Sequence, residues 1–198
     1  MTADTRAIAF ERAVLPDGSV IHIRPIMPED RGLLEQGFER LSDESRYRRF
    51  LHPVKRLGSR ELDYFTRVNH TDHEALVALG PHGTEPVGVA RYARLDDPDC
   101  AEVAIAVVDA WQGKGVGTVL LHDLVERAKA AGVRRFSAVC LADNADVIDL
   151  LGRLGSMRVD HPEPGLAELT IDLPDELTSD SELYAALRHA ASGRMETT

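Results

Sequence analysis

The stretch from Ala101 to Leu121, AEVAIAVVDAWQGKGVGTVLL, constrains the fold more than any other part of the chain. Its first half, up to Val108, is small or β-branched and apolar except for Glu102, a pattern typical of a strand covered on both faces. From Gly115 onward, apolar residues recur at helical spacing until a stop at Gly132. The stretch therefore predicts a strand, a glycine-bearing turn and a long amphipathic helix.

The turn has the features of an anion site. A helix N-terminus offers unpaired backbone N–H groups and a partial positive charge, and glycines let an anionic group approach them closely. The pattern therefore predicts a phosphate or pyrophosphate cradle. It is not a Walker loop, because Lys114 is followed by Gly115, and its three glycines at alternate positions do not fit the dinucleotide fingerprint. A tight strand-to-helix connection without a ligand is the alternative.

One known loop does match this turn. The run Gln112-Gly113-Lys114-Gly115-Val116-Gly117-Thr118 resembles the acyl-CoA pyrophosphate loop of the GNAT superfamily of N-acetyltransferases, whose pattern is Arg/Gln-x-x-Gly-x-Gly/Ala. The resemblance implies that Gly113 to Thr118 bind the pyrophosphate of acetyl-CoA, a cosubstrate, that Gln112 is also a cofactor-binding residue, and that the chain is an acyltransferase.

The rest of the chain predicts a mixed fold of the α/β class, α+β in type. Pro16-Asp17-Gly18 joins two strands as a hairpin, and three helices follow up to about Val68. The further predicted strands are 74–79, 87–95, 101–108, 135–141, 157–160 and 167–173, with helices after Gly115 and Asn144. This order predicts a mixed, mostly antiparallel twisted sheet flanked by helices on both faces, with one parallel step after strand 101–108. It is also the order of the GNAT fold.

The chain divides into three predicted segments. Residues 1–8 are expected to be a flexible N-terminus, and residues 9–173 the acetyltransferase domain. Residues 174–198 combine an acidic linker with a helical appendage that starts at a capping box, Ser179 to Glu182. The appendage packs either on the domain or on a second subunit.

Composition excludes several classes of function. The formal net charge of −10 argues against nucleic acid and anionic membranes as partners and is mildly favourable to a cationic amine, although solubility alone also accounts for it. Two cysteines, Cys100 and Cys140, make no disulfide framework, and the N-terminus lacks a secretion signal, so a cytoplasmic location is expected. The histidines show no metal-ligand spacing, so no metal site is predicted.

A closer resemblance is to the catalytic domains of bacterial protein lysine acetyltransferases that acetylate acyl-CoA synthetases. It rests on Ile23–Ile26 with Pro28–Asp30, on Arg40–Ser42 with Ser45–Phe50, on Ala101–Ala104 and on Asp143–Asn144. It implies a protein lysine acceptor, possibly on an acyl-CoA synthetase. The locally basic run Ser45–Phe50 is interpreted first as a solvated helix face and second as an anion site.

The resemblance also implies roles for the end of the central strand and for Asn144. The backbone of Ala106, Val107 and Val108 pairs with the pantetheine arm, and the N–H of Val107 or Val108 polarises the thioester carbonyl. Asn144 either contacts CoA or is a plain helix cap.

Glu102 is the predicted general base, because a carboxylate beside the attacking amine takes up its proton, and burial in the strand would strengthen it as a base. The alternatives are an exposed surface charge or one paired with an Arg. The chain departs from many GNAT enzymes at Leu151, where a Tyr is the usual general acid. His70, His73 and Tyr92 are the remaining candidates for an acid, each more simply a structural or surface residue.

The leading hypothesis is therefore acetylation of a protein lysine by direct attack on the thioester. Acetylation of a small amine is a second enzymatic hypothesis, and a non-catalytic acyl-CoA-binding regulatory module is a third, from another class. The sequence does not indicate the oligomeric state.

Overall fold

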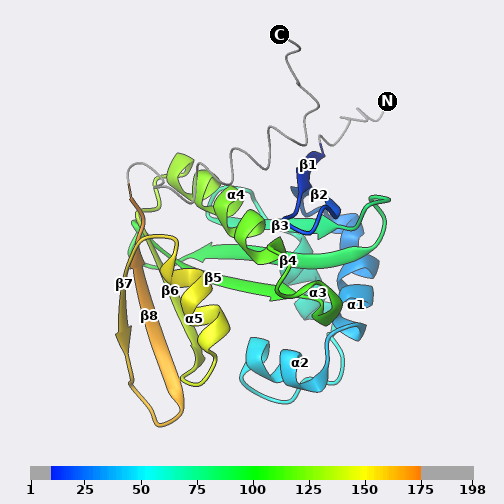
Figure 1. The fold of residues 1–198 in the computed structure, drawn as a ribbon. Helices are drawn as coiled ribbons and strands as arrows, with labels where there is room; N and C mark the ends of the chain where they lie inside the picture. Colours follow the sequence, from blue (N-terminus) through cyan, green and yellow to red (C-terminus); the bar gives the residue numbers. More distant parts are fainter. Residues whose placement is uncertain (1–9, 175–198) are drawn as a thin grey trace.

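The computed structural model describes residues 10–174 of the chain, built around one eight-stranded sheet (Figure 1). The strand order is β1-β2-β3-β4-β5-β6-β8-β7, and every neighbouring pair is antiparallel except β5 with β6. The strands are β1 (Glu11–Val14), β2 (Val20–Pro25), β3 (His73–Leu79), β4 (Pro86–Arg94), β5 (Cys100–Val107), β6 (Arg135–Leu141), β7 (Ser156–Asp160) and β8 (Leu166–Asp172). The predicted sheet, with its single parallel step, is confirmed.

Helices cover both faces of this sheet, as predicted. Figure 1 shows α4 and α5 on one face and α1 and α3 on the other, while α2 lies beside β5. The helices are α1 (Arg31–Glu39), α2 (Asp43–Phe50), α3 (Ser59–Thr66), α4 (Val116–Ala130) and α5 (Ala145–Gly152), with short 3-10 turns η1 (Pro28–Asp30) and η2 (Asp109–Trp111). The helix expected from Pro28 therefore starts as a 3-10 turn. The predicted N-terminal segment 1–8 and the helix after Ser179 lie outside the described residues.

The long helix α4 supplies one half of the core. Its apolar stripe, which includes Val116, Leu120 and Leu124, is fully buried against the sheet. The helix approaches β4 closely because Gly88 has no side chain: a Cβ there would lie 3.1 Å from Leu120 Cδ1. Burial of each such leucine contributes about 1.5–3 kcal/mol, so this packing fixes where the first turn of α4 stands.

On the opposite face, a buried ion pair holds α1 in place. The guanidinium of Arg24, on β2, donates to both carboxylate oxygens of Asp30 at 2.5 and 2.7 Å, and Asp30 also accepts from the N–H of Met27. Two parallel charge-assisted hydrogen bonds give this pair a defined geometry. It anchors η1, and with it the start of α1, to the sheet.

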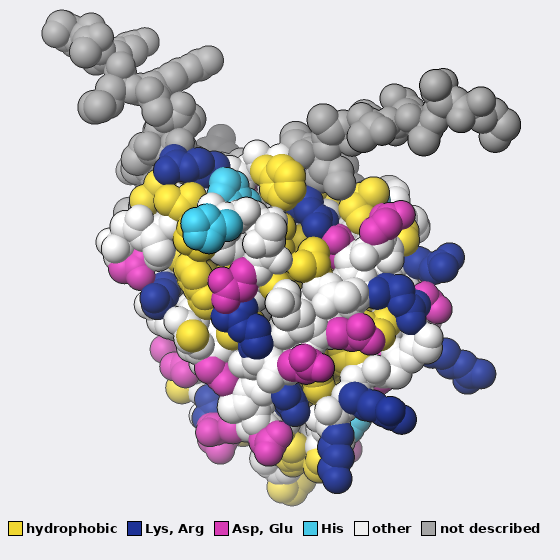
Figure 2. All heavy atoms as spheres, turned by 90° about the vertical axis from the view of Figure 1, so that its right-hand side faces the viewer, with side chains coloured by type: hydrophobic (Ala, Val, Ile, Leu, Met, Phe, Trp, Pro, Cys, Tyr) yellow, Lys and Arg dark blue, Asp and Glu magenta, His cyan; other side chains and the backbone are white. Residues whose placement is uncertain are grey.

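The face over α1 carries charges of both signs. In Figure 2, Lys and Arg side chains are interspersed with Asp and Glu side chains, so the net negative charge is not gathered there. Within residues 10–174, no helix has the length and apolar character needed to cross a membrane.

Candidate active site

The sheet opens between β5 and β6. These two strands pair in parallel only from Cys100↔Arg135 to Glu102↔Ser137, and beyond that point β5 follows β4 while β6 follows β8. The divergence leaves a wedge whose walls are the free edges of β5 and β6. In Figure 1, α5 lies over this part of the sheet.

A groove of about 800 Å³ runs through this wedge. Its walls come from the last turns of α2, from β5, from the loop into α4, from β6 and from α5. All of the predicted site residues line it except Val108, which is buried outside the groove. The structure therefore brings together residues from 102 to 144 that the sequence assigned to one site.

The loop into α4 presents a row of unused amides. Gly113 and Gly115 adopt the left-handed conformation, with φ of +70° and +97°. Among the described residues, the six backbone N–H groups from Gly113 to Thr118 have no protein acceptor. These groups stand at the positive end of a 15-residue helix, which is the arrangement that binds phosphate groups. Gly117 also permits close packing, since a Cβ there would lie 2.9 Å from Leu150 Cδ2 on α5.

Two side chains of the loop are already engaged with the protein. Lys114 forms an ion pair of 3.5 Å with Asp17 in the β1–β2 turn, and its ammonium lies 5.2 Å from the Trp111 ring centroid. The side-chain amide of Gln112 donates to the carbonyl of Val107 and to Asp109, both at 3.0 Å. The backbone N–H of Gln112 also donates within the protein, to the carbonyl of Asp109 at 3.2 Å.

Asp109 connects this loop to α2, a link that the sequence analysis missed. Its carboxylate accepts from the N–H of Ser42 at 2.7 Å and from the hydroxyl of Ser45. Burial raises the pKa of Asp109, but the hydrogen bonds from Ser45, Ser42 and Gln112 outweigh that effect and keep it below its usual value. No local pattern identifies this contact, because 67 residues separate Ser42 from Asp109.

The sequence analysis left open whether the N–H of Val107 or that of Val108 polarises a thioester, and the hydrogen bonds of β5 distinguish the two. The N–H of Val108 donates to the carbonyl of Val87 at 3.0 Å, so it is occupied by the β4 side. Because successive N–H groups in a strand point to opposite edges, that of Ala106 also faces β4, whereas that of Val107 faces the wedge. Of the two amides expected to polarise a thioester, that of Val107 therefore faces the wedge and that of Val108 does not.

Glu102 lies at the point where β5 and β6 part. The expectation that it is buried is wrong: its side chain is exposed in the groove. The pairing of β5 with β6 ends at this residue. Arg49 of α2 lies near enough for the charge of Glu102 to raise the pKa of Arg49, although burial has the larger effect and lowers it. Among the described residues, Glu102 forms no ion pair.

The residues of α5 in the groove are Asn144 and Leu151. Asn144 occupies the N-cap position, as a helix cap would, but its side chain makes no cap hydrogen bond. It is 8% exposed and lines the groove. Leu151 is buried in the groove wall, so the usual tyrosine position carries no hydroxyl.

The three other candidates for a general acid lie outside the groove. Tyr92 is buried on the α4 side and donates to the carbonyl of Thr71 at 2.8 Å. His70 is hydrogen-bonded to Glu74 at 2.7 Å. His73 accepts from the guanidinium of Arg91 at 2.6 Å, which requires a neutral ring. Each is structural, in agreement with the simpler interpretation.

His73 leads to a prediction about stability and pH. Burial, followed by the charge of Arg91, lowers the pKa of His73 to about 4. In the unfolded chain His73 becomes protonated below about pH 6.5, whereas in the folded chain it becomes protonated only near pH 4. The free energy of unfolding therefore falls as the pH is lowered from 6.5 to 4. Over this pH range we expect the free energy of unfolding to fall by about 1–2 kcal/mol more in the wild type than in His73→Gln. This figure is reduced because His73 is partly exposed to solvent. Urea unfolding at several pH values measures this difference, and parallel curves for the two proteins would contradict it.

Comparison with known proteins gives the family. A sequence profile of the acetyltransferase (GNAT) family matches residues 36–155. The acetyltransferase Pat of Mycolicibacterium smegmatis is 33% identical over 180 residues, which are 87% of this chain and 52% of that protein. The chain thus spans about half the length of this relative. The acetyltransferase PA5475 of Pseudomonas aeruginosa is 34% identical over 143 residues, covering 71% of this chain and 77% of that protein.

A solved structure agrees with this result. The GNAT domain of PAT from S. lividans superposes with a TM-score of 0.76 at 34% identity, covering 83% of this chain and 97% of that domain. The resemblance to the catalytic domains of bacterial protein acetyltransferases is therefore confirmed. Since the family profile also spans more than half of the sequence, this chain belongs to the acetyltransferase (GNAT) family.

Proposed function

We propose that this chain transfers an acetyl group from acetyl-CoA to the side-chain amine of a protein lysine, with Glu102 as the general base. The observation that carries the proposal is the row of unused amides from Gly113 to Thr118 at the head of the groove that also contains Glu102. The family uses acetyl-CoA as its donor. The diphosphate would lie on these amides, with Asn144 beside the pantetheine arm.

The free edge of β5 supports the position of the thioester. The pantetheine would pair with this edge as an added strand, and the N–H of Val107 would donate to the thioester carbonyl. This hydrogen bond strengthens as the carbonyl oxygen gains negative charge during attack. The carbonyl of Val107 is held by Gln112, so the end of the strand is kept rigid.

The role of Glu102 follows from the chemistry of the acceptor. A lysine amine has a pKa of about 10.4, so making it neutral at pH 7 costs about 4–5 kcal/mol. The exposed carboxylate of Glu102 can take this proton directly or through a water. The amine then attacks the carbonyl carbon, and the thiolate departs without a side-chain acid at Leu151, which the low pKa of a thiol permits.

The proposal is tested by incubating the purified chain with acetyl-CoA and an acyl-CoA synthetase, and by locating acetyl groups with mass spectrometry. We expect acetylation of one or a few lysines. A thiol-release assay across polyamines and amino sugars is run in parallel. Turnover of a small amine without any protein acetylation would contradict a lysine acceptor, and CoA binding without turnover of any amine would indicate a regulatory module.

A further inference from the structure

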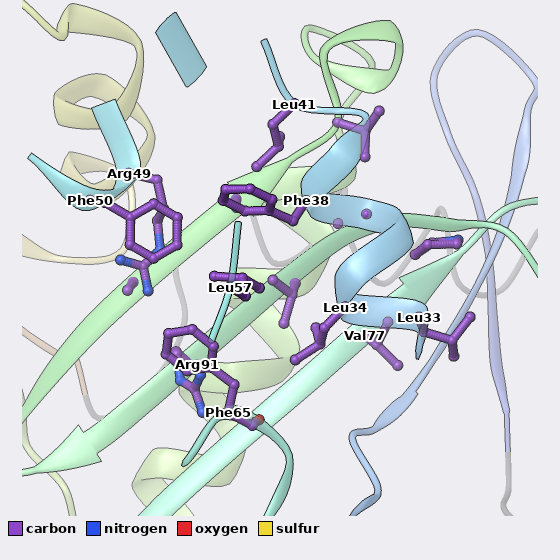
Figure 3. Close-up of a pocket in the computed structure, with 17 residues that line it drawn as sticks. Leu33, Leu34, Phe38, Leu41, Arg49, Phe50, Leu57, Phe65, Val77 and Arg91 are labelled. Carbon is purple, nitrogen blue, oxygen red and sulfur yellow. Dashed lines mark hydrogen bonds between the residues drawn. The ribbon is translucent and has the colours of Figure 1, made fainter. Parts of the chain in front are cut away.

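A second cavity lies beside the groove, on the face of the sheet that α1, α2 and α3 cover. It has a volume of about 70 Å³ and is lined mainly by apolar side chains, among them Leu34, Phe38, Phe50 and Phe65. On the same measure one water needs about 10–15 Å³, so the cavity has room for a short chain of several atoms. Figure 3 shows α1 side chains on one side of it and Phe50 and Phe65 on the other.

The cavity and the groove share part of their walls. Leu41, Arg49, Phe50, Ala104 and Ala106 line both. The two alanines lie on one face of β5, and their small side chains leave room between the wedge and the cavity. The cavity is thus adjacent to Val107, where we place the thioester, while Glu102 and the attacking amine lie toward the other end of the strand.

Two arginines enter this apolar space from different elements, Arg49 from α2 and Arg91 from β4 (Figure 3). Arg91 is 8% exposed, and its hydrogen bonds go to neutral acceptors, His73 at 2.6 Å and the carbonyl of Phe65 at 3.3 Å. The guanidinium of Arg49 lies 5.0 Å from the Phe50 ring centroid. Within residues 10–174, no Asp or Glu forms an ion pair with either arginine.

Arg91 therefore has no ion-pair partner among the described residues, and the charge of Glu102 acts on Arg49 without forming an ion pair with it. Burial and then the like charge of Arg49 lower the pKa of Arg91 to about 10, so Arg91 remains charged at neutral pH. Buried charges are normally paired, and a guanidinium matches a carboxylate with two parallel hydrogen bonds. A carboxylate on a short apolar chain is the ligand that fits both the apolar lining and the two charges.

We propose that this cavity binds the distal carboxylate of a dicarboxylic acyl group, so that the chain accepts four-carbon acyl donors of the succinyl class as well as acetyl-CoA. The inference rests on the proposed function, because it needs an acyl-CoA in the groove. Arg49, at the junction, would meet the carboxylate first, and Arg91 would hold it from the far wall. The acyl group is favoured over an acceptor carboxylate because the cavity adjoins Val107.

The transfer step is the same as for acetyl. The amine nitrogen attacks the thioester carbonyl, a C–N bond forms and the C–S bond breaks. The amine proton passes to Glu102, and the CoA thiolate takes up a proton from water. The distal carboxylate is unchanged, so no further reactant is needed.

The test compares two donors of equal chain length. Titration calorimetry of the full chain with CoA, succinyl-CoA and butyryl-CoA gives three dissociation constants. We expect the wild type to bind succinyl-CoA about tenfold tighter than butyryl-CoA, the effect of one hydrogen bond between charged groups. In Arg91→Met the dissociation constants for succinyl-CoA and butyryl-CoA should differ by less than about twofold. Arg91→Lys should keep part of the preference for succinyl-CoA. Arg49→Met is the second variant if Arg91→Met does not fold.

The calorimetry separates failure of the proposed function from failure of the cavity proposal. If neither CoA nor a thioester binds the wild type, the proposed function fails and this inference with it. If CoA and butyryl-CoA bind but succinyl-CoA binds no tighter, this inference alone is overturned. A preference for succinyl-CoA that is undiminished in Arg91→Met and in Arg49→Met would overturn the role given to the two arginines.

Discussion

Replacing Glu102 with Gln is expected to lower kcat for lysine acetylation by about 10²–10⁴-fold, the usual contribution of a general base. The exposed carboxylate faces the groove and has no ion-pair partner among the described residues, so its proposed task is proton transfer rather than structure. Steady-state kinetics at saturating acetyl-CoA measures the effect. The dissociation constant for CoA should change by less than about twofold, because Gln keeps the size of the side chain.

The pH profile separates loss of a base from loss of fold. Without Glu102 the rate depends on the fraction of lysine that is already neutral, so it should rise about tenfold per pH unit toward pH 10. Glu168→Gln is the matched control, since Glu168 is also an exposed strand glutamate but lies on β8, outside the groove. Activity of Glu102→Gln within threefold of the wild type at pH 7 would remove Glu102 from the mechanism.

The second large effect is expected at Gly115. An Ala there would have to adopt a φ near +97°, and its Cβ would lie 3.2 Å from Pro16 Cδ. The left-handed conformation costs a residue with a side chain about 1–2 kcal/mol, so the loop is expected to shift and its amides to lose their alignment. Loss of one charge-assisted hydrogen bond corresponds to an increase of about 10–100-fold in the dissociation constant for CoA. Titration calorimetry measures it.

Gly132→Ala is the control for backbone strain at Gly115. Gly132 also has a positive φ, +85°, at the other end of α4, where a Cβ would meet no atom within 4 Å. Its substitution should lower the melting temperature without weakening CoA binding. If Gly115→Ala and Gly132→Ala bind CoA equally well, the loop is not the diphosphate site.

The sequence was a good guide to features that depend on neighbours along the chain. The helix after Gly115 follows from apolar residues at helical spacing, and glycine permits, without dictating, the left-handed conformations found at Gly113 and Gly115. The hairpins and the parallel step from β5 to β6 through α4 were predictable from the order of elements along the chain, whereas the position of β8 between β6 and β7 was not predicted.

Features that depend on distant segments were not predictable. The apolar run of β5 indicated burial on both faces, but Glu102 is exposed, at the point where the pairing of β5 with β6 ends. The run Ser45–Phe50 was interpreted as a solvated helix face; this holds for Arg48, which pairs with Glu44, but not for Arg49, which enters the cavity. Its neighbour there, Arg91, is 42 residues away in sequence and has no local signal.

The central claim is that the amides from Gly113 to Thr118 hold the diphosphate of acetyl-CoA and thereby direct the thioester to Val107. A crystal structure with acetyl-CoA bound tests it most directly. We expect diphosphate oxygens within about 2.7–3.2 Å of these amides, and the thioester oxygen within the same distance of the Val107 nitrogen. A nucleotide bound elsewhere, or a thioester away from β5, would contradict it.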